Sequence, residues 1–418
     1  MIFVITNVFL VMSINKINLL KFFLLLLSSI LFALKTSAQD SIKTDSIPEK
    51  NLIKHSDKGF EFETADNRFL LQLGASLQFR FATPYDEDPV TYEDFSTANK
   101  NSLEINRARL KLGGYIYKPW LKYFMEYELG QSNLLDFRLT IEKYKWLSFK
   151  IGQWKTDYNR ERIISSGAQE MMDRSILNRP FTLDRQQGIS VYGHLAGKGA
   201  ANFNYWISVL DGNGRGSRSG DDTHLMYEGR LQWNPLGRVV TMTGSDIERT
   251  LKPALLIAVA GATNRSPYTR FSQAGGGELE GFPAGVAGQY SVRQGVLETA
   301  FKYKGFSWQQ ESHVKYILNN LSDSATNLSG SYFQAGYFPN GLLDFVPKDL
   351  EVACRYAVYK PDESKTENLK KEFSVAANYF FSGHQNKLTM EYGKISLQEP
   401  NLPTVSRGRF RIQWDISF

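Results

Sequence analysis

The last ten residues of the chain, 409–418, alternate strictly between polar and apolar side chains. The apolar positions are Phe410, Ile412, Trp414, Ile416 and Phe418, and every residue between them is polar or charged. Successive side chains of a strand point to opposite faces, so this period of two predicts a strand with one face in an apolar medium and the other in water. An amphipathic strand of a soluble sandwich would show the same pattern, so other segments must decide between the two.

The N-terminal residues have the pattern of a secretory signal. Lys16 and Lys21 are followed by an apolar stretch over 22–34, and the small residues 36–38 then form a cleavage site. The apolar stretch is shorter than the roughly 20 residues that a membrane-spanning helix needs. We therefore predict a signal peptide over 1–38 that is cleaved near Ala38, and a retained signal anchor is the alternative.

The remainder of the chain divides simply. Translation starts at Met1 or Met12, since the residues before Met12 add an apolar stretch that a signal does not need. Residues 39–58 are polar, which predicts a flexible leader. Alternating segments recur from there to the C-terminus with no sign of a second domain. We therefore predict one domain over 59–418.

The composition combines a moderate mean hydropathy of −0.33 with many aromatic residues, 28 Phe, 21 Tyr and 7 Trp. Strands of a transmembrane β-barrel are only half apolar, and aromatic girdles surround both rims of the barrel. The composition therefore fits a barrel in a membrane, although soluble secreted β-proteins can share it.

Metal and redox chemistry find little support in the sequence. Cys354 is the only cysteine, which excludes an intramolecular disulfide and a multi-cysteine zinc site, and the five histidines include no pair at metal-ligand spacing. The formal net charge is +6, and removal of the three lysines of the predicted signal leaves about +3. We expect no cofactor, no metal and no nucleic-acid partner.

The repeated alternation predicts an all-β fold, an antiparallel transmembrane β-barrel of about 16 strands. An even number returns both termini to the periplasmic side, and the terminal aromatic residue resembles the closing strand of bacterial outer-membrane barrels. One side of each strand would contact outer-membrane lipid, and Cys354 would lie on that side. The predicted strands are 68–82, 102–117, 120–130, 134–143, 148–154, 187–196, 201–210, 224–233, 252–263, 291–303, 305–317, 331–338, 348–359, 371–381, 386–395 and 407–418.

The connections sort into short periplasmic turns and long external loops, as such barrels require. Residues 234–251 and 339–347 are exceptions, because they would be unusually long periplasmic links. The longest external connection, 155–186, follows the fifth strand.

That connection carries its own helical signal. Ser166 and Gln169 fit a capping box, apolar residues follow at helical spacing, and Pro180 ends the run. We predict a constriction loop that folds into the lumen. A loop that only covers the rim is the alternative.

Basic residues are frequent at the strand positions that alternate with the lipid-facing ones and would therefore face the lumen. Rings of cations in a pore favour anions, and guanidinium groups suit phosphate and carboxylate oxygens. Acidic residues share the same interior and could neutralise these cations across strands. The candidate pore-lining and anion-binding residues are Arg80, Arg107, Arg109, Lys111, Arg138, Arg160, Arg162, Arg174, Arg185, Arg230, Arg355, Arg409 and Arg411.

A series of short motifs resembles the phosphate-selective porin O/P family from about Gly59 to Phe418. The motifs, in order, are Arg107-Ala108-Arg109 with Gly114-Tyr115, Gly152-Gln153-Trp154-Lys155 with Arg160-Glu161-Arg162, Asp173-Arg174-Ser175, Arg185-Gln186-Gln187-Gly188, Gly336-Tyr337-Phe338-Pro339, and Glu351 with Arg355-Tyr356.

This resemblance implies a sixteen-stranded outer-membrane porin, a homotrimer, whose lumen arginines and lysines pass phosphate or polyphosphate. It carries over only the matched arginines at positions 107, 109, 160, 162, 174 and 185.

We therefore expect a water-filled channel for small solutes, with a preference for phosphate or similar anions, in the bacterial outer membrane. One alternative is a structural or adhesive barrel with a plugged lumen. The other is an outer-membrane hydrolase, against which the scarce histidine and the lack of a Gly-x-Ser-x-Gly motif argue.

Overall fold

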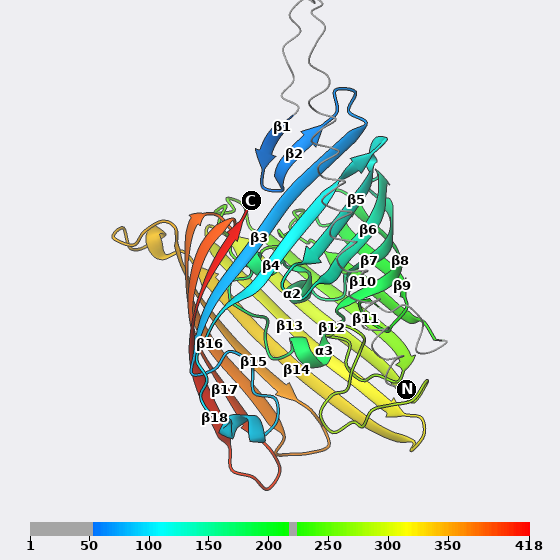
Figure 1. The fold of residues 1–418 in the computed structure, drawn as a ribbon, viewed down its shortest axis with the longest axis vertical. Coiled ribbons are helices and arrows are strands. Elements are labelled where there is room, and N and C mark those ends of the chain that lie inside the picture. The colour runs from blue at the N-terminus through cyan, green and yellow to red at the C-terminus, as the bar shows by residue number, and fades with distance from the viewer. Residues whose placement is uncertain (1–52, 217–223) are drawn as a thin grey trace, which may run out of the picture. The chain divides into compact units, whose positions relative to one another are not determined.

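Sixteen antiparallel strands, β3 to β18, form a closed barrel in the computed structural model of the chain (Figure 1). The structure describes residues 53–216 and 224–418. The predicted signal peptide and most of the predicted leader lie outside these described residues. The predicted antiparallel barrel and its strand number are confirmed.

The strands are long, and each matches a segment predicted from the alternation. They are β3 (Phe69–Thr83), β4 (Ser102–Ile116), β5 (Lys118–Glu128), β6 (Asn133–Tyr144), β7 (Leu147–Lys155), β8 (Arg185–Ala196), β9 (Asn202–Leu210), β10 (Met226–Trp233), β11 (Ala254–Ser266), β12 (Tyr290–Tyr303), β13 (Phe306–Asn319), β14 (Ser324–Tyr337), β15 (Leu350–Lys360), β16 (Leu369–Ser382), β17 (Asn386–Gln398) and β18 (Val405–Ser417).

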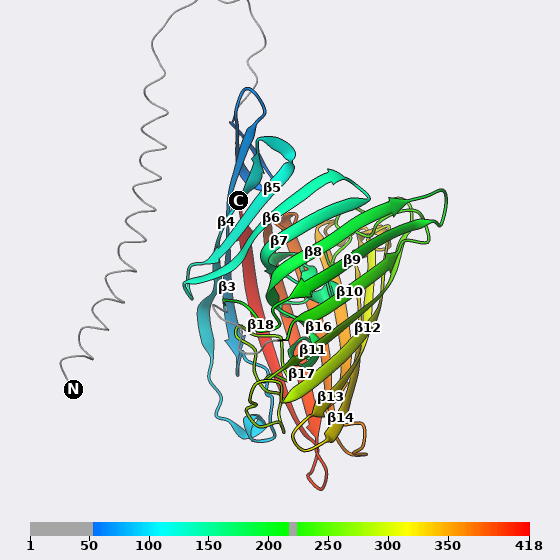
Figure 2. The same ribbon diagram turned by 90° about the vertical axis from the view of Figure 1, so that its right-hand side faces the viewer.

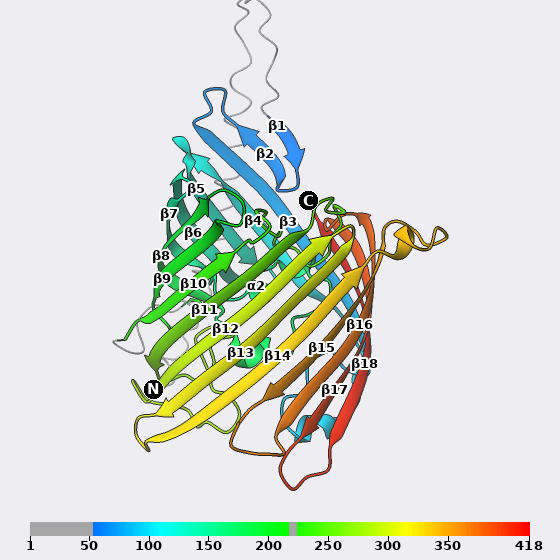
Figure 3. The same cartoon turned by 180° about the vertical axis from the view of Figure 1, so that it is seen from behind.

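The barrel closes where the last strand meets the first. β18 pairs with β3 from Phe410 opposite Thr83 to Ser417 opposite Ser76. The terminal Phe418 continues the ladder, because its backbone N–H donates to Ala75 O at 3.0 Å and its carbonyl accepts from Ala75 N–H at 2.8 Å. Closure gives the backbone groups of every barrel strand a partner on both sides, which lipid could not supply. Figure 3 shows the barrel from behind.

Alternation along each strand separates an apolar outer surface from a polar interior. On β18, Phe410 and Trp414 are 38% and 45% exposed, whereas Arg411 and Gln413 between them are each 1% exposed. Cys354 is exposed on the outer side, as its parity predicts. No helix within the described ranges is long and apolar enough to cross a membrane.

A β-bulge in β4 changes the face of the sheet to which the side chains before it point. Gln78 of β3 pairs with Arg107, but the next residue, Phe79, pairs with Ile105, so Asn106 is the extra residue. Ile105 and Arg107 share a sequence parity, yet the bulge puts Ile105 on the outer face, where it is 61% exposed. Arg107 consequently points into the lumen.

The connections are very unequal in length. At one end of the barrel they include the loops 84–101, 156–184 and 267–289, with a 3-10 helix, η1 (Glu93–Ser96), in the first. At the other end most are tight turns, but two are long: 234–253, and 338–349 with η3 (Pro339–Gly341). The two unusually long periplasmic links that the sequence predicts are therefore present.

A hairpin precedes the barrel and lies beside β3 (Figure 2). It consists of β1 (Ile53–Ser56) and β2 (Gly59–Glu63), and Phe60 of β2 pairs with Leu73 of β3, beyond the end of β18. Residues 53–58 were predicted as the end of a flexible leader and instead form this hairpin, because β3 offers an unpaired edge there.

We predict that Gly152→Ala destabilises the barrel. Gly152 has φ +127°, and a Cβ would lie 2.2 Å from the carbonyl oxygen of Phe137. Backbone strain of this kind costs about 1–3 kcal/mol, so the midpoint of heat denaturation should fall. At Gly229 the nearest atom to an added Cβ is 4.0 Å away, so Gly229→Ala is the control. An unchanged midpoint for Gly152→Ala would contradict the backbone geometry described for β7.

Candidate functional site

The loop between β7 and β8, residues 156–184, lies inside the barrel (Figure 1). It contains two single-turn helices, α2 (Arg160–Ile163) and α3 (Asn178–Phe181), and a 3-10 turn, η2 (Ser166–Ala168). The predicted helix from Ser166 to Asn178 is wrong, since residues 169–177 are not helical. Pro180 lies within α3 rather than ending a helix.

Backbone N–H groups of this loop donate to carboxylates of the barrel wall instead of to carbonyl groups within a helix. The backbone N–H of Met172 donates to Glu391 Oε2 at 2.9 Å, and that of Ile176 donates to Glu372 Oε2 at 2.9 Å. The side chain of Gln169 donates to the carbonyl oxygen of Glu161 at 2.9 Å instead of capping a helix. Hydrogen bonds to charged acceptors are stronger than those between neutral groups. The bonds to the wall carboxylates therefore override the helical preference of the loop sequence.

Other side chains of the wall bond to the rest of the loop, both to its backbone N–H groups and to its carbonyl groups. Glu298 and Glu311 accept from the N–H groups of Arg160 and Glu161 at 3.0 and 2.7 Å. Cationic side chains of the wall donate to loop carbonyl groups, each at 2.8 Å: Lys387 to Gln169, Arg355 to Asp173 and Lys315 to Pro180. These contacts come from β12, β13, β15, β16 and β17, so the loop is fixed to one side of the barrel.

Apolar contacts support this attachment. Met171 packs against Ala353 and Ala376 on the inner wall. Leu177 and Phe181 belong to a larger buried cluster with wall residues that include Tyr332. The outer loop 267–289 also folds inward, because Phe271 belongs to this cluster and its carbonyl oxygen accepts from Asp184 N–H at 2.8 Å.

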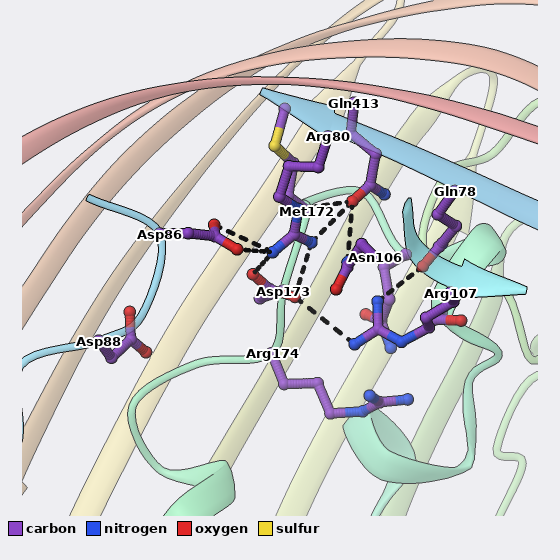
Figure 4. A network of polar contacts seen from close by, with 12 residues as sticks. Gln78, Arg80, Asp86, Asp88, Asn106, Arg107, Met172, Asp173, Arg174 and Gln413 are labelled. Carbon is purple, nitrogen blue, oxygen red and sulfur yellow. Dashed lines mark hydrogen bonds and ion pairs between the residues drawn. The ribbon is translucent and has the colours of Figure 1, made fainter. Parts of the chain in front are cut away.

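Asp173 at the tip of the loop joins it to the barrel seam (Figure 4). Its carboxylate accepts from Arg80 of β3 at 2.8 and 3.0 Å and from Arg411 of β18 at 2.5 Å. Arg107 of β4 lies 3.8 Å from the same carboxylate. Burial opposes ionisation of Asp173, yet Arg80, Arg411 and Arg107 hold its pKa well below its usual range.

A second segment enters the lumen from the opposite end. In the connection 234–253, the N–H of Gly244 donates to the carbonyl oxygen of Ala168 at 2.8 Å. Arg160 donates to the carbonyl oxygens of Thr241 and Thr243 at 2.5 and 3.0 Å. The two inner segments therefore support each other midway along the barrel.

Several cavities remain beside these segments, and four of them take their names here from their lining or their position. The outer cavity, 310 Å³, is lined by residues that include Arg80, Asp86, Asn106, Arg107, Arg162, Asp173 and Arg174. The arginine cavity, 210 Å³, is lined by Asn106, Arg107, Arg109, Glu128, Gln131, Leu135, Lys155, Arg162, Ser166, Arg174, Arg185 and Arg215.

The other two cavities lie toward the end of the barrel with the tight turns. The inner cavity, 690 Å³, is lined by residues that include Arg107, Arg109, Lys111, Ser166, Thr241, Lys302 and His384. The aromatic cavity, 670 Å³, is lined by residues that include Lys111, Phe124, Arg138, Lys150, Lys155, Tyr192 and Trp206. Because neighbouring cavities share lining residues, the four form a connected series. The arginine and aromatic cavities lie against the β3–β9 wall, whereas the inner cavity also reaches Lys302 on β12 and His384 in the β16–β17 turn.

The arginine cavity, at the middle of the series, carries a strong excess of positive charge. Seven cationic side chains line it against one carboxylate, that of Glu128. Arg109 bonds to Glu128 at 2.7 Å, and Arg162 pairs with Asp184. Lys155 and Arg174 make no ion pair with any described residue. Burial together with Arg162 and Arg107 lowers the pKa of the Arg174 guanidinium, which reflects this crowding of cations.

The thirteen candidate residues divide into two groups by their surroundings. Eight line a cavity: Arg80, Arg107, Arg109, Lys111, Arg138, Arg162, Arg174 and Arg185. Five line none of the four cavities and instead contact the loops or wall carboxylates: Arg160, Arg230, Arg355, Arg409 and Arg411.

Cavity-lining cations outside the thirteen candidates include Lys150, Lys155, Arg215 and Lys302. Lys155 ends the Gly152-Gln153-Trp154-Lys155 motif, so its position beside the other cations of the loop was a usable signal. Lys302 lies on β12, and its ammonium group donates to Thr241 and Thr243 hydroxyls at 2.9 and 2.6 Å. Only the fold of the 234–253 segment brings these hydroxyls to it.

The family described as phosphate-selective porin O and P matches residues 85–404. Porin O of Pseudomonas aeruginosa is 26% identical over 144 residues, which cover 32% of this chain and 31%, about a third, of that protein.

Solved barrels share the fold at low sequence identity. An anion-selective porin from Comamonas acidovorans superposes with a TM-score of 0.56 at 10% identity, over 83% of this chain and 99% of that one. OmpT, an outer membrane protein of Vibrio cholerae, gives 0.53 at 9% identity, over 84% and 98%.

We predict that Asp173→Asn loosens the loop tip. It leaves Arg80, Arg107 and Arg411 without their shared carboxylate, and breaking a fully buried pair costs about 3–5 kcal/mol. The Asp173 side chain is 27% exposed, so we expect a loss of about 2 kcal/mol in the free energy of unfolding. Chemical denaturation measures this loss. Glu363→Gln, in an exposed loop, is the control. Equal stability of both variants would argue against a stabilising role for the contacts of Asp173 with the three arginines.

Proposed function

The chain belongs to the family of phosphate-selective porins O and P and is an outer-membrane β-barrel, and from this premise we propose that it conducts small anions through a water-filled channel. The observation that carries the proposal is the arginine cavity, whose seven cations lie between larger cavities on either side. An anion that passes along the β3–β9 wall would meet this cluster midway.

Phosphate and similar oxyanions suit the chemistry of the cluster. Guanidinium groups present paired N–H donors that match the oxygens of phosphate and carboxylate. Arg107, Arg109, Arg162 and Arg174 approach the arginine cavity from β4 and from the loop, so an anion would be approached from two sides. The matching family is described as phosphate-selective and the Comamonas porin as anion-selective, and both descriptions agree with a preference for anions.

The loop 156–184 is proposed to form the constriction. Its attachment to β12–β17 fills that side of the barrel, and Arg162, Ser166 and Arg174 lie on the side that lines the arginine cavity. The segment 234–253 supports the loop from the other end. The constriction would therefore be rigid, and its charge would set selectivity.

A plugged structural barrel is the second candidate, and the buried apolar cluster under the loop is the observation that favours it. Cavities of 690 and 670 Å³ beside the loop support the channel instead. We assign the chain no enzymatic role, since the family match points to a channel.

We also propose that the chain assembles as a homotrimer through its β7–β10 wall. Three of its four strands, β7, β9 and β10, have 9, 9 and 8 residues and β8 has 12, whereas β12, β13 and β14 have 14 each. At a tilt near 45°, 8–9 residues rise only about 20 Å, less than the apolar band of about 25 Å. Contact with a neighbouring protomer would shield this shorter wall.

The selectivity test removes two cations without introducing an acid. We predict that Arg107→Gln combined with Lys155→Gln lowers the anion-to-cation permeability ratio about fivefold or more, because one charge at close range in water is worth about 1 kcal/mol. The reversal potential in a potassium chloride gradient across a planar bilayer gives this ratio. Lys304→Gln removes an exposed cation from a turn outside the cavities and should change nothing. A double variant with the wild-type ratio would refute the assignment.

A further inference from the structure

Aromatic and cationic side chains alternate on the wall of the aromatic cavity. Phe124 on β5, Tyr192 on β8 and Trp206 on β9 line it and are half-buried, so part of each ring is open to the lumen. Aromatic residues at the rims of a barrel serve contact with lipid, but these three face inward. A polar passage for inorganic ions does not need such rings, so they call for a separate explanation.

Each ring lies near a cation. The guanidinium carbon of Arg138 is 4.5 Å from the centre of the Phe124 ring. The ammonium nitrogen of Lys150 is 5.1 Å from the ring centres of both Trp154 and Tyr192. The guanidinium carbon of Arg230 is 5.6 Å from the centre of the Trp206 ring, on one of its faces. These distances are within the range of cation–π contacts.

Strand register sets these groups side by side. Phe124 is directly opposite Arg138, and Arg138 is opposite Gly152, which has no side chain to cover it. Tyr192 is directly opposite Trp206. We call Phe124, Arg138, Lys150, Tyr192 and Trp206 the aromatic band.

Two carboxylates that contact residues of the aromatic band already have cationic partners. Glu142 accepts from Lys122 at 2.5 Å and from the Tyr192 hydroxyl at 2.6 Å. Asp157 accepts from Lys150 at 2.8 Å. Lys111 and Lys155 line the same cavity and make no ion pair with any described residue. The cavity therefore keeps cations available for an anion.

We infer that the aromatic band is a binding site for organic anions that carry a flat ring. The ring would stack on Trp206 or Phe124, and the anionic group would reach Lys111, Lys155 or Arg138. This inference rests on the proposed channel for access, but the binding itself does not require conduction. It extends the substrate class from small inorganic anions to ring-bearing ones, held between the arginine cavity and the exit of the pore.

Benzoate and acetate test the inference, because they share a carboxylate and differ in the ring. Calorimetric titration of the purified full chain in detergent should give benzoate an affinity at least tenfold above that of acetate. Trp206→Leu should weaken benzoate about tenfold, a change of about 1.4 kcal/mol, and should leave acetate unchanged.

A matched pair of substitutions controls for folding. Phe124→Leu changes the inward ring and should weaken benzoate, whereas Phe137→Leu changes an outward ring on the neighbouring strand, 57% exposed, and should not. Equal affinity for benzoate and acetate in the wild-type chain would overturn the inference, as would unchanged benzoate affinity in the Phe124→Leu variant.

Bilayer recordings separate this result from the proposed function. A channel that conducts chloride but binds benzoate no better than acetate would refute the aromatic site alone. A chain that binds benzoate selectively but never conducts would refute the channel and keep the site.

Discussion

The structure depends on hydrogen bonds between carboxylates of the barrel wall and the backbone of the loop 156–184. Glu298, Glu311, Glu372 and Glu391 accept from loop N–H groups between 2.7 and 3.0 Å, and wall cations donate to loop carbonyls. A loop buried in a protein must find partners for its peptide groups. Here charged side chains supply them, so the loop can be irregular and still be fixed in one place.

Fixing the loop to the β12–β17 side has a consequence for the opposite side. The arginine and aromatic cavities lie along the β3–β9 wall, and cations that make no ion pair with a described residue, such as Lys111 and Lys155, line them. On the attached side, Arg355 of β15 is paired with Glu372, and Glu298 of β12 is paired with Arg230 of β10. Basic residues of the same barrel thus divide into cations that hold the loop and cations that are available to solutes.

Alternation made the strands predictable, because a lipid-facing strand needs an apolar residue at every second position whatever its neighbours are. The loop was less predictable. Its helical signal after Ser166 was outweighed by Glu372 and Glu391, which lie about two hundred residues away in the sequence. The same limit applies to the arginines: parity predicted that Arg107 and Arg355 face the interior, but only the fold shows that Arg355 meets Glu372 while Arg107 lines cavities.

The central claim is that the barrel is open on one side of the loop and sealed on the other. Replacing Cys354, which is exposed on the outer surface, with Ser leaves a chain without cysteine. Two isosteric substitutions then compare the sides: Ser166→Cys, which lines the arginine cavity, and Ser374→Cys, which is 3% exposed on the attached wall. An anionic thiol reagent added during bilayer recording should reduce the current of Ser166→Cys and leave Ser374→Cys unchanged. Equal reaction at both positions would contradict the account.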